Sequence, residues 1–218
     1  MEIYGVAATV INNERFTLML LLYSKGATNR INEPVEGITR VQKLMFLLSK
    51  ERAVAQVGKL KFEPYAYGPY DQTIYDNLAF LRNMRLLDDG SAEDQSGENA
   101  TTDDLMSVVN AQTTVPVRDA TEFDEDVSFD FLMEGLADEL PDRYQTERYK
   151  LSALGIAEVE HRLKAAQNDP NLPKVLGAIE NVKTRFNQMR LREILKYVYD
   201  KYPDSAKNSV IADAVRIN

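Results

Sequence analysis

The segment Phe62–Leu87 constrains the fold more than any other part of the chain. Aromatic residues alternate along its first part, as is typical of a strand. Gly68-Pro69 predicts a turn there, because glycine adds backbone freedom and proline suits the first turn of a helix. The carboxylate of Asp71 can accept hydrogen bonds from free backbone N–H groups, which predicts a capped helix over Gln72–Asn83.

Helices are predicted before this segment. Phe16–Ser24 is apolar around its whole circumference, which indicates a central helix buried on every side. Thr39 can cap the next helix, in which apolar residues from Val41 to Leu48 recur with helical spacing along one face. Arg40 and Lys43 lie outside that set. We therefore expect an amphipathic helix with a basic solvent side.

Strands and further helices are predicted after it. Met84–Asp88 and Arg148–Leu151 are interpreted as the outgoing and returning strands of a small wing, and Ser152 can cap a helix that follows. Periodic apolar residues predict two more helices, around 175–186 and 191–202, and a short last one. The predicted fold class is mainly α with a small β-wing (α+β), a winged helix-turn-helix core with extra C-terminal helices.

Charge divides the chain unevenly. Residues 88–140 hold sixteen acidic side chains against the single basic residue Arg118, although the net charge of the whole chain is only −8. We interpret this stretch as an acidic, partly flexible insertion in the wing, because it has few apolar residues to bury. The expected organisation is a winged-helix core over 1–87 and 141–168, and a C-terminal helical extension over 169–218.

Several functional classes lack support in the sequence. With no cysteine and one histidine, His161, the chain cannot form disulfides or a multi-histidine metal site, and it suits a reducing cytoplasm. The longest apolar run, 16–23, is too short to span a bilayer. Phosphate-binding loops and hydrolase elbows are missing from the sequence, and the acidic residues of 122–130 lack a glycine-centred calcium loop. We expect no enzyme activity, cofactor, metal or membrane association.

Two blocks, Arg40–Phe46 and Phe62–Leu87 with its Tyr67-Gly68-Pro69-Tyr70 core, resemble prokaryotic winged-helix proteins of the Panacea, or SocA-like antitoxin, group. Related bacterial proteins resemble the C-terminal Leu191–Pro203 as well. The resemblance covers roughly residues 15–87 and 147–210. It implies a non-catalytic protein that works as an antitoxin, adaptor or regulator by binding another macromolecule.

Two kinds of partner are weighed from the residues around the predicted recognition helix. Protein binding would use the tyrosines, whose rings are apolar and whose hydroxyls are polar; the candidates are Tyr65, Tyr67, Tyr70 and Tyr75. DNA binding would use basic and amide side chains; the candidates are Arg40, Lys43, Lys59, Lys61, Gln72, Thr73 and Asn77.

The charge of the predicted helix decides between these partners. Asp71 and Asp76 would repel a phosphate backbone, and no basic residue appears in the helix before Arg82. Core packing of the tyrosines stays open. We favour a cytoplasmic antitoxin-like or adaptor-like protein that binds a toxin or another regulated protein. A DNA-binding transcription regulator, dimeric through its C-terminal helices, is the alternative.

Overall fold

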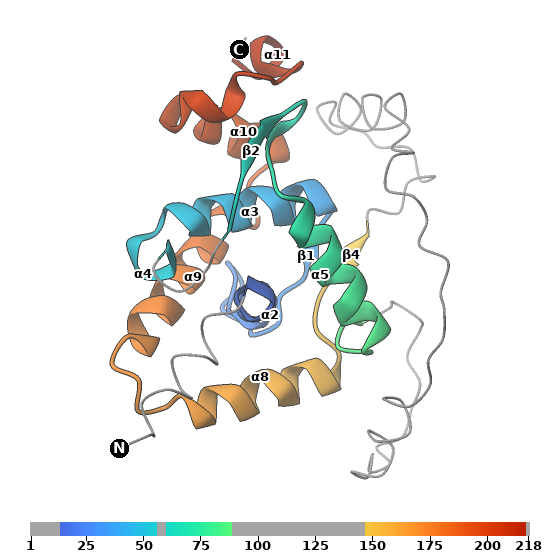
Figure 1. Cartoon of the computed structure of the whole chain (residues 1–218), viewed down its shortest axis with the longest axis vertical. Helices are drawn as coiled ribbons and strands as arrows, with labels where there is room; N and C mark the ends of the chain where they lie inside the picture. The colour runs from blue at the N-terminus through green and yellow to red at the C-terminus, as the bar shows by residue number, and fades with distance from the viewer. Residues whose placement is uncertain (1–13, 56–59, 89–146, 217–218) are drawn as a thin grey trace. The chain divides into compact units, whose positions relative to one another are not determined.

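Helix α2 (Glu14–Tyr23) lies at the centre of the fold, with every residue from Phe16 to Leu22 buried. Figure 1 shows it end-on, surrounded by other helices. These are α3 (Ile38–Lys50), α5 (Gln72–Asn83), α8 (Ala153–Ala165) and α9 (Leu172–Phe186). The prediction of a helix buried on every side is confirmed, and its all-round apolar sequence is the reason.

The computed structural model describes residues 14–55, 60–88 and 147–216. Lys59, the predicted insertion beyond Asp88 and its acidic residues at 122–130 lie outside these ranges. All described residues belong to one compact unit. In these ranges the protein is mainly helical, with two small antiparallel sheets of two strands each.

Helix α3 departs from the predicted amphipathic pattern, since all residues from Val41 to Leu48 are buried. It contacts α9, β3 (Gly68–Tyr70) and α10 (Leu191–Lys201), so more than one of its faces is covered. The expectation of a basic solvent side is therefore wrong for Lys43, which is only 3% exposed. The predicted cap at Thr39 is also wrong: the N-cap is Gly37, with no side-chain hydrogen bond.

The aromatic segment forms a hairpin of β2 (Glu63–Tyr65) and β3. The predicted turn at Gly68-Pro69 is wrong, because both residues lie in β3 and the turn is at Ala66 and Tyr67. The predicted helix is confirmed as α5. Its Asp71 cap is confirmed too, since the Asp71 carboxylate accepts from the Thr73 backbone N–H at 2.9 Å.

The second sheet joins β1 (Val35–Glu36) to β4 (Arg148–Tyr149). The returning strand is thus present, but the predicted outgoing strand over 84–88 is reduced to a single bridge between Leu87 and Leu151. Ser152 caps α8 as predicted, accepting from the Gly155 N–H at 3.1 Å.

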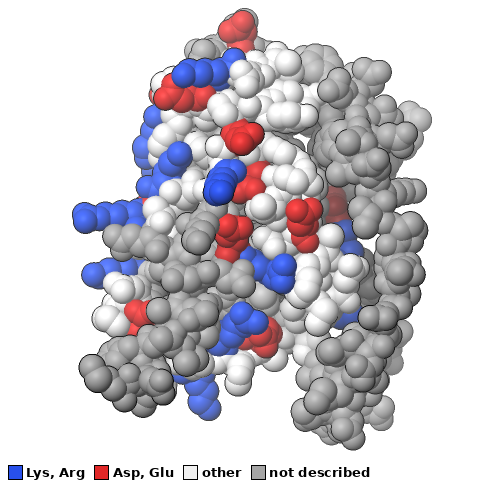
Figure 2. All heavy atoms as spheres, viewed as in Figure 1, with Lys and Arg blue, Asp and Glu red and all other residues white. Residues whose placement is uncertain are grey.

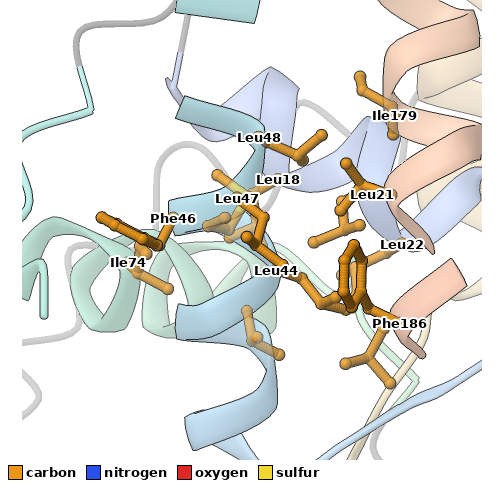
Figure 3. Packing of buried hydrophobic residues seen from close by; sticks show 14 of the residues in the cluster. Leu18, Leu21, Leu22, Leu44, Phe46, Leu47, Leu48, Ile74, Ile179 and Phe186 are labelled. Atoms are coloured by element: carbon orange, nitrogen blue, oxygen red, sulfur yellow. The ribbon is translucent and has the colours of Figure 1, made fainter. Parts of the chain in front are cut away.

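The C-terminal helices pack onto the same core. Helix α9 contacts α2, α3 and the short α4 (Arg52–Ala55), and the predicted helices around 175–186 and 191–202 are confirmed as α9 and α10. The 3-10 helix η1 (Pro203–Ala206) and α11 (Ala212–Arg216) follow. Buried Leu and Phe residues from α2, α3 and α9 meet in the centre (Figure 3). Burial of each such side chain contributes about 1.5–3 kcal/mol to hydrophobic stabilisation.

Across the described ranges, no helix combines the length and the hydropathy that crossing a bilayer requires.

Candidate interaction surface

Three of the four predicted tyrosines lie together. Tyr65 and Tyr70 come from the two strands of the hairpin, and Tyr75 comes from the first turns of α5. The ring centroids of Tyr65 and Tyr70 are 5.0 Å apart, and those of Tyr70 and Tyr75 are 5.7 Å apart. Such spacing is typical of favourable aromatic pairs. We call Tyr65, Tyr70 and Tyr75 the tyrosine row.

The row is accessible at one end and half-buried at the other. Tyr65 is 50% exposed, whereas Tyr70 and Tyr75 are half-buried. Burial, reinforced by the neighbouring tyrosines, raises the pKa of Tyr75 to about 12, and burial also raises the pKa of Tyr70. The hydroxyls of Tyr70 and Tyr75 therefore stay protonated at neutral pH. The row presents ring surface together with groups that can both donate and accept hydrogen bonds.

The fourth candidate, Tyr67, serves a different purpose. It is partly buried and packs against the hydrophobic core rather than joining the row. Its neighbour Gly68 has a positive φ of 85° and lies directly against Tyr199 of α10. The hairpin tip is thus docked onto the C-terminal helices.

Backbone contacts hold both edges of the hairpin. On β3, the buried Lys43 Nζ donates to the Pro69 carbonyl at 3.0 Å. On β2, Asn208 Nδ2 donates to the Pro64 carbonyl at 3.0 Å, and at the turn the Val210 N–H donates to the Ala66 carbonyl at 2.9 Å. Because its edge carbonyls are engaged, the hairpin is a firm support for the tyrosine row.

Gln42 of α3 fixes the junction between hairpin and helix. Its Nε2 donates to the Asp71 carbonyl at 2.9 Å, and its Oε1 accepts from the Asp71 N–H at 3.1 Å. The Asp71 carboxylate also accepts from the Lys61 N–H at 3.0 Å. Tyr70 and Tyr75 are therefore held on either side of a buried, fully engaged aspartate.

The fold buries or engages some of the predicted DNA-binding residues and leaves others exposed around Asp71. Lys43 is buried under the hairpin, and Asn77 is buried with its Oδ1 accepting from Arg15 Nε at 3.1 Å. Arg40 donates to carbonyls at the end of α9, including that of Asn187 at 2.8 Å. The remaining described candidates, Lys61, Gln72 and Thr73, are exposed.

Charge on the visible face is mixed as well. Figure 2 shows Lys and Arg side chains projecting at its left edge, whereas acidic and basic side chains are interspersed over its centre.

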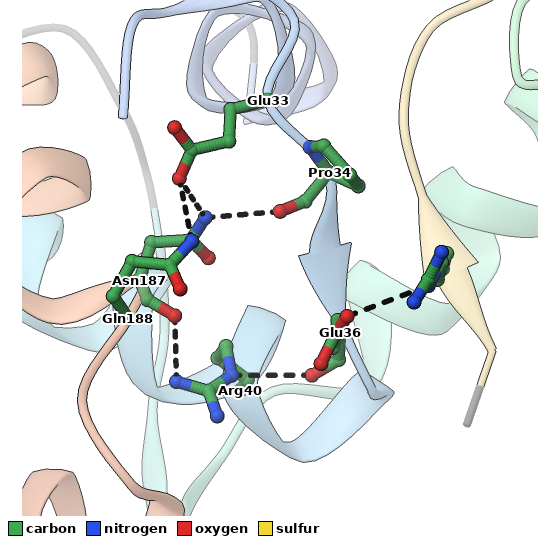
Figure 4. A network of polar contacts seen from close by, with 7 residues as sticks. Glu33, Pro34, Glu36, Arg40, Asn187 and Gln188 are labelled. Atoms are coloured by element: carbon green, nitrogen blue, oxygen red, sulfur yellow. Dashed lines mark hydrogen bonds and ion pairs between the residues drawn. The ribbon is translucent and has the colours of Figure 1, made fainter. Parts of the chain in front are cut away.

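A polar cluster that sequence reasoning missed joins the loop before β1 to the end of α9 (Figure 4). Glu33, only 7% exposed, accepts from the Thr28 N–H at 2.9 Å, from Asn187 Nδ2 at 3.0 Å and from Gln188 Nε2 at 2.8 Å. Burial raises the pKa of Glu33, but these hydrogen bonds outweigh it and lower the pKa to about 2. A pocket of about 510 Å³ lies beside this cluster, with Arg40 in its lining.

The end of α2 is held by a second buried lysine. Lys183 of α9 is fully buried, and its Nζ donates to the carbonyls of Leu22 at 2.7 Å and Ser24 at 2.8 Å. Burial lowers its pKa to about 7, and the nearby Glu33 carboxylate opposes that shift. The free carbonyls at a helix C-terminus favour a cation there. Lys183 therefore supports the core instead of joining a basic surface.

Among the described residues, no group of three or more His, Asp or Glu side chains is placed to hold a metal ion. His161 is exposed on α8. Comparison with protein-family models, curated proteins and solved structures gives no match.

Proposed function

We propose that this chain is a non-enzymatic protein-interaction module that binds a protein partner through the tyrosine row, in the manner of an antitoxin or adaptor. The observation that supports this most is the row itself: aromatic side chains in ring contact, half-exposed at Tyr65, on a hairpin held at both edges. Tyrosine is enriched in the energetically dominant parts of protein interfaces.

Rigid support favours binding of this kind. A surface that is already ordered loses little conformational entropy when a partner docks. The contacts of Lys43 with Pro69 and of Gln42 with Asp71 order the tyrosine row before any partner arrives.

The winged-helix part of the proposal rests on element order. Helix α3, the hairpin and α5 are followed by Leu87, which bridges to Leu151 beside β4. The antitoxin or adaptor class rests on the resemblance of Arg40–Phe46 and Phe62–Leu87 to the SocA-like group.

Co-purification from the native host tests the proposal. The tagged full-length chain is expected to retain a protein partner in stoichiometric amount through washes at raised salt. A DNA fragment from its own promoter is tested in parallel, because true phosphate contacts weaken steeply as salt rises. Tight sequence-specific DNA binding without any stable protein partner would refute the proposal.

A further inference from the structure

We infer that the tyrosine row takes a cationic segment of the partner, one that presents arginine side chains. This inference rests on the proposed function and adds to it the chemistry of the partner. Its basis is the set of charges around the row and the presence of Lys and Arg side chains over other aromatic rings of this chain.

Two exposed carboxylates, Glu63 and Asp76, lie beside the row. Glu63 pairs directly with Tyr70 across the hairpin, and it shares a face of β2 with Tyr65 because alternate residues of a strand point the same way. Asp76 of α5 is exposed, and its charge acts on Tyr70 together with that of Asp71.

Among the described residues, Glu63 and Asp76 are exposed carboxylates, whereas Asp71 is buried and already hydrogen-bonded. Lys61 is an exposed cation two residues before Glu63 in the sequence. This part of the surface is therefore negative and aromatic at once.

Several rings elsewhere in the chain are covered by the chain's own cations. The Arg15 guanidinium lies 3.5 Å from the ring centroid of Phe80, on the same helix as Tyr75, and also donates to Asn77. Arg185 lies 4.9 Å from the ring of Tyr197. By contrast, no Lys or Arg from the described ranges lies over Tyr65 or Tyr70. The half-exposed ring of Tyr65 and the accessible part of Tyr70 therefore offer ring surface to a cation from a partner.

Arginine fits this surface better than lysine does. Its planar guanidinium stacks on an aromatic face while its N–H groups donate to a carboxylate, as Arg15 does with a ring and an amide oxygen. A segment carrying successive arginines can therefore stack on Tyr65 and Tyr70 and pair with Glu63 and Asp76.

The test uses the full-length chain and a short peptide of alternating arginine and glycine, with lysine and glutamate versions of the same peptide. Affinity is measured by calorimetry at physiological salt. Two site variants are compared with wild type: Tyr65→Ala with Tyr70→Ala, and Glu63→Gln with Asp76→Asn. The matched control, Glu180→Gln with Asp200→Asn, removes the same charge from exposed positions of α9 and α10.

We expect the arginine peptide to bind more tightly than the lysine peptide, and each site variant to weaken it about tenfold while the control leaves it unchanged. Equal weakening by the control would overturn the inference, because binding would then follow the net charge of −8 alone. Binding of a single-stranded oligonucleotide would also overturn the inference if the Glu63→Gln with Asp76→Asn variant bound it more tightly than wild type. The tyrosine row would then be a surface on which bases stack.

Retention of the native partner, measured alongside peptide affinity, distinguishes failure of this inference from failure of the proposed function. If the tyrosine variant releases that partner but the row shows no preference for the arginine peptide, the proposed function stands and the inference is wrong. If the row prefers the arginine peptide and no native protein is retained, the preference of the row for arginine stands, but the proposed function fails.

Discussion

Gly68 of the hairpin lies directly against Tyr199 of α10: a β-carbon added at Gly68 would be 2.9 Å from Cε1 of the tyrosine ring. The Tyr199 hydroxyl in turn hydrogen-bonds Ser209 Oγ at 2.8 Å, within the segment that also holds the edge of β2. The Tyr-Gly-Pro-Tyr motif and the C-terminal helices, far apart in the sequence, thus form one packed unit.

Replacing Gly68 by alanine tests this docking. The substitution forces a side chain into a positive φ of 85° and against Tyr199, so we expect Gly68→Ala to lower the free energy of unfolding by about 3 kcal/mol. Gly177→Ala is the matched control, since nothing lies within 4 Å of its added β-carbon. In urea unfolding, the control is expected to stabilise the protein by about 0.5–1 kcal/mol. Equal effects of the two variants would contradict the docking.

Asp71 offers a test of the junction between hairpin and helix. Asp71→Ala removes the cap of α5 and the acceptor for Lys61 and Thr73, and should cost about 2 kcal/mol of stability. Asp76→Ala deletes an exposed carboxylate of the same helix and should change stability by less than about 0.5 kcal/mol. Thermal unfolding of both variants measures the difference, and similar melting temperatures would exclude a capping role.

Protonation of Glu33 is expected to lower the stability of the fold in acid. Its pKa is about 2 in the folded chain and 4.5 ordinarily, so its contribution is complete above pH 4.5 and is lost as the pH falls toward 2. The loss amounts to about 3 kcal/mol. Glu33→Gln should reduce this loss of stability, whereas Glu36→Gln, at an exposed residue of β1, should preserve it. Urea unfolding at a series of pH values distinguishes the two variants. If Glu33→Gln lost stability in acid as wild type does, the stabilising role of the Glu33 carboxylate would be contradicted.

The buried lysines Lys43 and Lys183 determine how stability should change with pH above 7. Burial lowers the pKa of Lys43 and of Lys183 from 10.5 to about 7, so between these values the unfolded chain binds more protons than the folded one. Stability should therefore rise with pH from about 7 toward 10.5. Lys183→Met should reduce this slope, whereas Lys174→Met, exposed on the same helix, should not. A slope that is identical in both variants would show that Lys183 titrates normally.

Local signals in the sequence were sufficient to predict much of the fold. The all-round apolar pattern of Phe16–Leu22 predicted the central helix, and Asp71 and Ser152 marked the starts of α5 and α8, because these features act within a few residues. The turn was misplaced because Gly68 is needed for its close approach to Tyr199, a distant contact, and not for chain reversal.

The candidate site was predictable only in part. Tyr65, Tyr70 and Tyr75 were among the chosen residues, but their separation from Tyr67 depends on the hairpin register. Lys43 looked solvent-facing because periodicity identifies one buried face of a helix and cannot reveal that a hairpin covers another. The Glu33–Asn187 contact joins residues 154 positions apart, and no local pattern encodes it.

The most direct test of the proposed function compares partner retention by variants at two positions that are equally exposed. Tyr65 and Ile31 are both 50% exposed, one in the tyrosine row and the other in the loop before β1. With folding verified by thermal unfolding, Tyr65→Ala combined with Tyr70→Ala should reduce retention of the native protein partner at least tenfold, while Ile31→Ala retains it at the wild-type level. Unchanged retention in the tyrosine variant, or its loss in Ile31→Ala alone, would contradict binding through the tyrosine row.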